Sequence, residues 1–154
     1  RYFIIGWSNF LEDIPMTQTM HPNRPNILIV MTDHQRGDTV LPEHPAITPN
    51  LDRFALQGIT FTETYCPSPH CCPSRATFFS GLYPSRHGVW NNVCNDQALS
   101  RGLNAEVCLW SEDLADAGYS MHFSGKWHVS VEESPADRGD EPTGLPQNRR
   151  TAER

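Results

Sequence analysis

The chain has 154 residues, a formal net charge of −6 and 13 prolines, and 38% of its residues are hydrophobic. This length allows one domain with a single core, and the acidic balance argues against general binding to nucleic acid, whose phosphates attract basic surfaces. No stretch is long and apolar enough to span a bilayer, so no membrane partner is expected. The five cysteines do not form the paired pattern of a secreted disulfide framework. We therefore expect a cytoplasmic location, and a secreted or periplasmic one stays open because the true amino terminus is uncertain.

The first predicted element is a strand over residues 26–32, a continuous apolar run that ends at Asp33 and His34. Ligands collect at the carboxyl ends of strands in open α/β sheets, so Asp33 is a candidate ligand of a cation. Taken alone, an Asp in this place is equally typical of a plain turn after a strand.

Further elements alternate between helix and strand. Residues 48–58 predict a helix with Thr48 as N-cap, a buried stripe formed by Leu51, Phe54 and Ala55, and Gly58 as its end. Residues 59–65 alternate as a half-buried strand does, residues 111–118 predict a short capped helix, and residues 119–124 predict another strand. This order is typical of an α/β domain.

The run from His70 to Thr77 carries the strongest chemical signal. Cys71 and Cys72 precede Pro73, which suits the first turn of a helix, where unpaired N–H groups favour an anionic nucleophile. Arg75 adds a guanidinium whose donors match the oxygens of a sulfate or phosphate ester. A cysteine-dependent phosphatase loop is excluded, because it needs an arginine where this chain has alanine and then threonine.

Two interpretations of residues 70–77 without a catalytic cysteine stay open. Free cysteines are often small buried hydrophobes, and a pair at a helix start is consistent with that role. A zinc site is the second alternative, although adjacent cysteines make a tetrahedral site awkward. Its ligands would be Cys66, His70, Cys71 and Cys72.

Lys126 is the only lysine of the chain, and it follows Gly125 at the end of the last predicted strand. Residues separated by one position in an extended segment point the same way, so Lys126 and His128 are predicted to enter one pocket. The alternative for these two residues is a solvated charge and a hydrogen-bonded edge histidine.

Residues 71–75, 81–88 and 125–128 together resemble the type I sulfatases of the alkaline-phosphatase-like superfamily. The resemblance implies an α/β fold with a mixed sheet flanked by helices, incomplete at the carboxyl end of this chain. Family members are several times longer, so residues 23–131 are expected to be the amino-terminal part of the catalytic domain. Residues 1–22 would be a disordered leader or upstream extension, and residues 132–154, which hold few large apolar side chains, a poorly ordered tail.

The resemblance also implies a covalent chemistry at Cys71. In this family the first cysteine of the motif is oxidised to formylglycine by a formylglycine-generating enzyme, and the aldehyde hydrate attacks a small-molecule sulfate ester. Cys72 would be only the variable position. Arg75 and Lys126 would contact the sulfate, and His128 would act as a base beside the hydrate.

A divalent metal is implied as well, held by Asp33, His34 and the modified Cys71. Calcium is the expected ion, with manganese or magnesium as alternatives. The family usually has Asp, Gln or Asn where this chain has His34, and an imidazole is a poorer partner for calcium than an oxygen ligand.

Two other functions remain open. The same fold and cofactor serve phosphonate monoesters and phosphodiesters, and nothing in these residues separates sulfur from phosphorus. Alternatively, this chain is a catalytically dead, truncated module. We expect the 154-residue chain by itself to be inactive, because half of the metal shell lies beyond it in the family.

Overall fold

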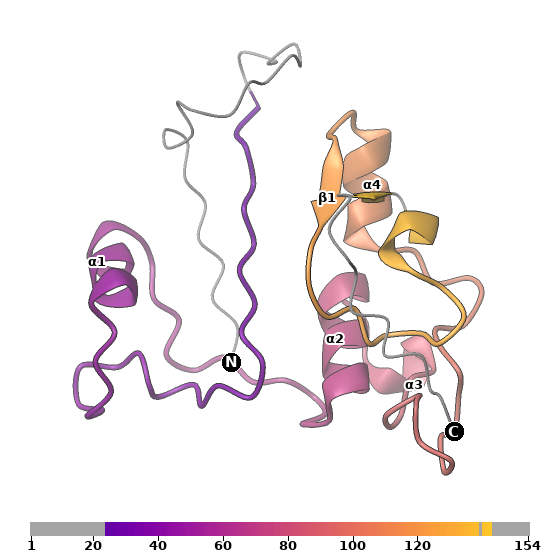
Figure 1. Ribbon diagram of the computed structural model, residues 1–154, viewed down its shortest axis with the longest axis horizontal. Coiled ribbons are helices and arrows are strands. Elements are labelled where there is room, and N and C mark those ends of the chain that lie inside the picture. The colour runs from indigo at the N-terminus through magenta and orange to yellow at the C-terminus, as the bar shows by residue number, and fades with distance from the viewer. Residues whose placement is uncertain (1–23, 139, 143–154) are drawn as a thin grey trace. The chain divides into compact units, whose positions relative to one another are not determined.

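The computed structural model describes residues 24–138 and 140–142 (Figure 1). The chain divides into two compact units, residues 1–65 and 66–154. The leader predicted for residues 1–22 lies outside the described residues. None of the described helices combines the length and the apolar character of a bilayer-spanning segment.

Helix α1, Pro49–Gln57, is the one regular element among the described residues of the first unit, and it confirms the helix predicted for residues 48–58. Thr48 stands at the N-cap position, but its hydroxyl donates a hydrogen bond to the Asp52 carboxylate at 2.8 Å instead of capping a backbone N–H. The predicted apolar stripe is only half covered, since Leu51 and Phe54 are half-buried and Ala55 is exposed. The residue pattern thus predicts the helix correctly but overestimates its burial.

The strands predicted for residues 26–32 and 59–65 are absent from the described structure, so both predictions were wrong for this chain. Apolar side chains along both segments are exposed, among them Leu28, Val30 and Phe61. A strand needs a second backbone to complete its hydrogen bonds, and apolar periodicity reports nothing about such a partner.

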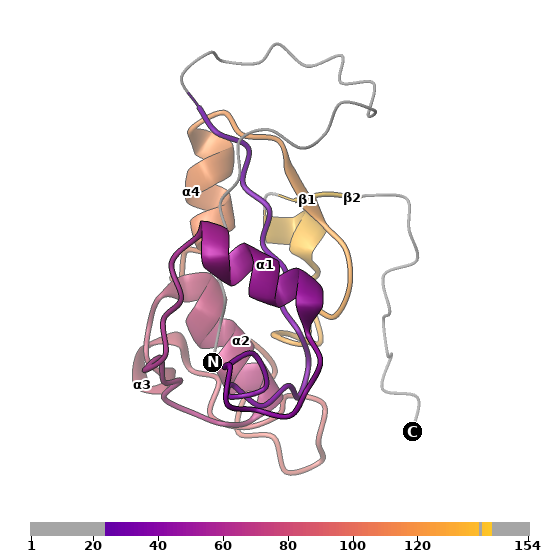
Figure 2. The same ribbon diagram turned by 90° about the vertical axis from the view of Figure 1, so that its left-hand side faces the viewer.

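Most regular structure of the second unit surrounds helix α2, Cys71–Ser80. The unit continues with α3 (Pro84–His87), α4 (Trp110–Asp116), β1 (Met121–Phe123), the 3₁₀ helix η1 (Pro135–Arg138) and β2 (Asp140–Pro142). Strands β1 and β2 pair in parallel, α2 contacts α3 and α4, and α4 contacts both strands (Figure 2). The helix predicted near 111–118 and the strand predicted within 119–124 are confirmed. The larger mixed sheet of the expected α/β fold stays a prediction.

Phe79 of α2 lies at the centre of the aromatic core and is 6% exposed. Its ring stacks on Trp110 with centroids 5.7 Å apart and contacts Trp127 at 4.9 Å and Phe123 at 6.2 Å. The indole N–H of Trp110 donates to the Phe78 carbonyl at 3.0 Å, which satisfies its polar edge inside the core. One side chain of α2 therefore joins α4, β1 and the segment that follows β1.

Residues 135–138 and 140–142 form regular structure, although the segment 132–154 was predicted to be poorly ordered. Contacts of charged side chains stabilise this part of the segment, where apolar side chains are few. The Arg138 guanidinium pairs with Glu133 at 2.9 Å and with Glu112 of α4 at 3.4 Å, and it also donates to the Val107 carbonyl at 3.2 Å. Pro135 is buried. Residues 143–154 lie outside the described residues, and the domain boundaries stay predictions.

Replacing Phe79 with alanine should lower the free energy of unfolding by about 3–5 kcal/mol, because it removes a ring that contacts four aromatic neighbours. Urea unfolding followed by tryptophan fluorescence measures this change. Phe61→Ala is the matched control: its ring is 61% exposed, and its removal should cost less than about 0.5 kcal/mol. Equal losses for the two variants would contradict the assigned core.

Candidate active site

Cys71 is the first residue of α2, and Pro73 is the third, as the sequence predicts. Cys71 is half-buried, whereas Cys72 is 0% exposed. Burial raises the pKa of the Cys72 thiol to about 11, and the Val93 amide and the Lys126 charge oppose that rise only in part. Cys72 is therefore the small buried hydrophobe of the two, while Cys71 keeps contact with solvent.

Cys72 is bonded through both its backbone and its side chain. Its amide donates to Oδ1 of Asn92 at 3.1 Å, and its sulfur accepts from the Val93 amide at 3.4 Å. Val93 is itself fully buried. The loop after α3 thereby fixes the residue next to Cys71.

Arg75, one turn further along α2, is 7% exposed. Its Nη1 donates a hydrogen bond to the backbone carbonyl of Lys126 at 2.5 Å. The indole of Trp127 donates to the Glu133 carbonyl at 3.0 Å, and its ring packs on Phe79. Arg75 and Phe79 lie four residues apart, on one face of the helix, and together they hold the Gly-Lys-Trp-His segment against α2.

The structure thus brings Arg75 and Lys126 together within the second unit. Lys126 is half-buried, and its positive charge opposes the burial-driven rise in the pKa of the Cys72 thiol. The buried Arg75 guanidinium, in the second turn of α2 and bonded to the segment that carries Lys126, makes a region that favours anions.

His128 follows two residues later with a φ of 55°, which is left-handed backbone. The prediction that Lys126 and His128 point the same way assumed an extended segment, and that assumption is wrong at residue 128. The Nδ1 atom of His128 is buried. A left-handed residue changes the chain direction, so the backbone itself sets where this imidazole lies.

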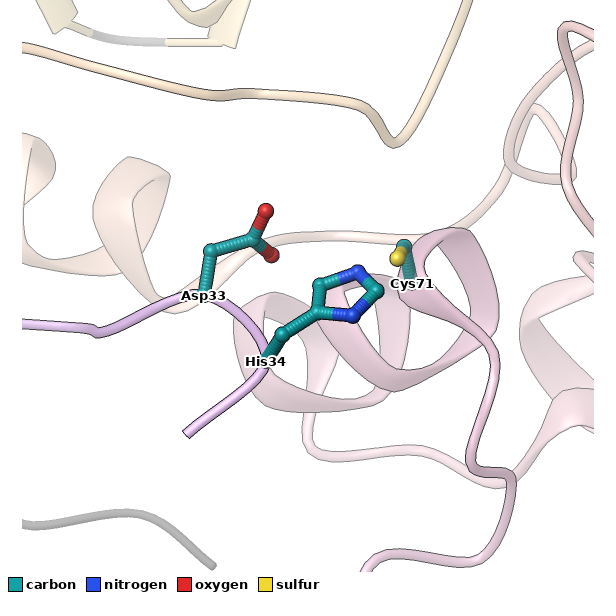
Figure 3. Close-up of side chains that lie close together, drawn as sticks. All are labelled: Asp33, His34 and Cys71. Carbon is teal, nitrogen blue, oxygen red and sulfur yellow. The ribbon is translucent and has the colours of Figure 1, made fainter. Parts of the chain in front are cut away.

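Asp33 and His34 lie in the first unit, and both are exposed. His34 has a φ of 58°, and within the described ranges His34 and His128 are the two non-glycine residues with positive φ. Such backbone costs of order 1–3 kcal/mol and is concentrated at functional sites. Figure 3 draws the groups predicted to ligate a metal: the Asp33 carboxylate, the His34 imidazole and the Cys71 thiol.

The zinc alternative finds no support within the described part of the chain. No three donor atoms from Cys66, His70, Cys71 and Cys72 lie within 4.8 Å of one another. The thiol of Cys66 instead donates to the Ser68 carbonyl at 3.0 Å. Adjacent cysteines at a helix start face different directions, which accounts for the failure.

His87 of α3 is buried and was not among the predicted site residues. Its Nδ1 accepts from the Val89 amide at 3.1 Å, so its proton lies on Nε2, which donates to Thr77 Oγ1 of α2 at 3.0 Å. Burial lowers the pKa of His87. Next to it, Gly88 has a φ of 83°, and a Cβ there would stand 2.3 Å from the Asn104 side chain. This network holds α3 against the second half of α2.

Comparison with known proteins shows the family to which this chain belongs. A family model described as Sulfatase matches residues 25–146, and the chain therefore belongs to the sulfatase family. Human steryl-sulfatase is 40% identical over 115 residues, and human arylsulfatase A is 38% identical over 109 residues. The uncharacterized sulfatase YidJ of Escherichia coli is 38% identical over 108 residues.

The match covers 71% of this chain and 20% of steryl-sulfatase, and 70% of this chain and 21% of arylsulfatase A. For YidJ it covers 69% of this chain and 20% of the relative. The chain thus spans about one fifth of the length of the curated relatives it matches. The matched region includes every residue predicted from the motifs.

Lowering the pH below about 6.5 should destabilise the chain through His87. Because burial depresses the pKa of the folded imidazole, the unfolded state takes up the proton first as the pH falls, and the free energy of unfolding decreases. Urea unfolding between about pH 8 and pH 5 measures the slope. His87→Gln cannot titrate but keeps a donor for Thr77, so its slope should be shallower. An identical slope in the parent chain and in the variant would show that His87 is not a source of the pH dependence.

Proposed function

We propose that the protein carrying this chain is a hydrolase of sulfuric esters. The observation that supports this most is the hydrogen bond from buried Arg75 to the Lys126 carbonyl, which joins two cationic residues to the helix turn that begins at Cys71. Family membership makes sulfate the expected anion. The names steryl-sulfatase and arylsulfatase A refer to steryl and aryl substrates of those relatives.

Charge neutralisation is the first task of such a site. The oxygens of a sulfate ester carry negative charge and repel a nucleophile, so cations must be in place before attack. Lys126 supplies a mobile ammonium for the sulfate, and Arg75 supplies a fixed guanidinium. Because Arg75 is buried and bonded to the Lys126 backbone, its contribution requires little reorganisation.

Residue 71 supplies the nucleophile in this proposal. Oxidation of Cys71 to formylglycine by a formylglycine-generating enzyme would give an aldehyde whose hydrate provides an attacking oxygen and a second hydroxyl. The choice of Cys71 over Cys72 is supported by exposure, since Cys72 is enclosed and its pKa is raised to about 11. His128 is proposed to accept the proton of the second hydroxyl when sulfate is released.

A divalent cation is proposed to be held by ligands that include Asp33 and His34, and residue 71 would add a donor. The Asp33 carboxylate suits calcium, magnesium or manganese, whereas the His34 imidazole and an unmodified Cys71 thiol suit zinc. Conversion of Cys71 to formylglycine replaces a sulfur ligand with an oxygen ligand. The three ligands would then favour a hard cation, with calcium as the first candidate. The bound cation would polarise a sulfate oxygen.

The test is a pair of substitutions in the enzyme that carries this chain. Cys71→Ser should retain a covalently bound sulfate after exposure to an aryl sulfate, because serine attacks once but has no second hydroxyl with which to expel the group. Cys72→Ala should turn over at nearly the parent rate. Intact-protein mass spectrometry detects the adduct, and peptide mass spectrometry over residues 66–75 detects the aldehyde of the parent.

Loss of activity in Cys72→Ala with normal turnover in Cys71→Ser would contradict the assignment of the nucleophile. Faster hydrolysis of a phosphate diester than of an aryl sulfate would move the assignment from sulfur to phosphorus. The 154-residue chain by itself is proposed to be inactive, because it spans about one fifth of its relatives. Activity in that chain would refute this part of the proposal.

A further inference from the structure

The first turn of α2 is capped by a residue from a distant part of the chain. The first four N–H groups of a helix have no partner within the helix, and a side chain just before the helix usually satisfies one of them. His70 occupies that place but makes no side-chain cap. Instead, Asn92 Oδ1, 20 residues further along, accepts the hydrogen bond of the Cys72 amide at 3.1 Å.

A second bond ties the same loop to the same residue. The Val93 amide donates to the Cys72 sulfur at 3.4 Å, so adjacent loop residues hold both the backbone and the side chain of Cys72. The Val93 carbonyl in turn accepts a hydrogen bond from Arg101 at 3.4 Å, and the Val93 side chain is fully buried. Two bonds to one residue, from a loop anchored by the buried Val93 side chain, restrict both the position and the rotation of the first helical turn.

The loop also has bonds that do not involve α2. The Asn91 side chain donates to the Gln97 carbonyl at 2.9 Å and accepts from the Leu99 amide at 3.0 Å. The two neighbouring asparagines therefore bond to different partners. The Asn91 side chain bonds within the loop, and the Asn92 side chain bonds to α2. This division supplies a matched control for any test of Asn92.

We propose that Asn92 is a positioning residue for Cys71, acting through its hydrogen bond to the Cys72 amide. The two cysteines are consecutive, so fixing the peptide group at residue 72 fixes the direction in which the side chain of residue 71 leaves the helix. The catalytic value of this positioning rests on the proposed hydrolase function. The structural part, control of the first turn by Asn92, is independent of it.

The structural part is tested by amide hydrogen exchange of Cys72 in the 154-residue chain. Asn92→Ala removes the acceptor and should speed exchange of the Cys72 amide by about tenfold, since one hydrogen bond is lost at a helix end. Asn92→Asp keeps an acceptor oxygen and should restore slow exchange. Asn91→Ala breaks two bonds within the loop and should leave Cys72 exchange unchanged.

Equal exchange of Cys72 in the parent and in Asn92→Ala would overturn the proposal, as would equal acceleration in Asn91→Ala, which would indicate a general loosening of the loop. If Asn92→Ala does not fold, Asn92→Asp decides the question. Slow exchange in Asn92→Asp supports the cap, and fast exchange overturns it.

The catalytic part is tested in the enzyme that carries this chain. Asn92→Ala should lower kcat by about tenfold with a smaller change in KM, because a misdirected nucleophile still binds substrate. An unchanged kcat in an active enzyme would overturn positioning and leave the hydrolase assignment intact. An enzyme that hydrolyses no sulfate ester would refute the function, while the exchange result would still decide whether Asn92 controls the turn.

Discussion

The hydrogen bond from the Arg75 guanidinium to the Lys126 carbonyl is the interaction on which the candidate site depends. It connects a helix start, defined by the cysteines, to a segment 51 residues away that carries the only lysine of the chain. A guanidinium that is 7% exposed needs partners, and a backbone carbonyl satisfies one of its donors without cancelling its charge. The same contact therefore stabilises the second unit and keeps positive charge beside residue 71.

Helix α2 organises the rest of that unit through residues on successive turns. Asn92, in the loop after α3, bonds to its first turn, and Arg75 in its middle bonds to the segment after β1. Thr77, near its end, is hydrogen-bonded to the buried His87. Phe79 adds the apolar contacts that keep α4 and Trp127 in place. A helix so constrained would be a rigid support for the nucleophile proposed at residue 71, and orientation in catalysis requires such support.

Local sequence rules predicted the features that depend on near neighbours. The Cys-Cys-Pro run indicated the start of α2, Pro49 indicated α1, and the uniqueness of Lys126 drew attention to a residue that is half-buried. Most of the failures involve distant partners. Residues 26–32 have the composition of a strand but pair with no other strand among the described residues, and the cap provided by Asn92 has no motif around it. The left-handed backbone of His128 breaks the alternation that an extended segment would give.

The central claim, that Arg75 holds Lys126, can be measured at a single atom. Because Lys126 is the only lysine, growth with lysine labelled by ¹³C at the carbonyl marks one carbonyl carbon in the whole chain. Arg75→Gln should shift this NMR signal toward the position of a carbonyl without a charged donor, whereas Arg86→Gln, which changes an exposed arginine, should leave it in place. An unchanged signal in a folded Arg75→Gln chain would contradict the account.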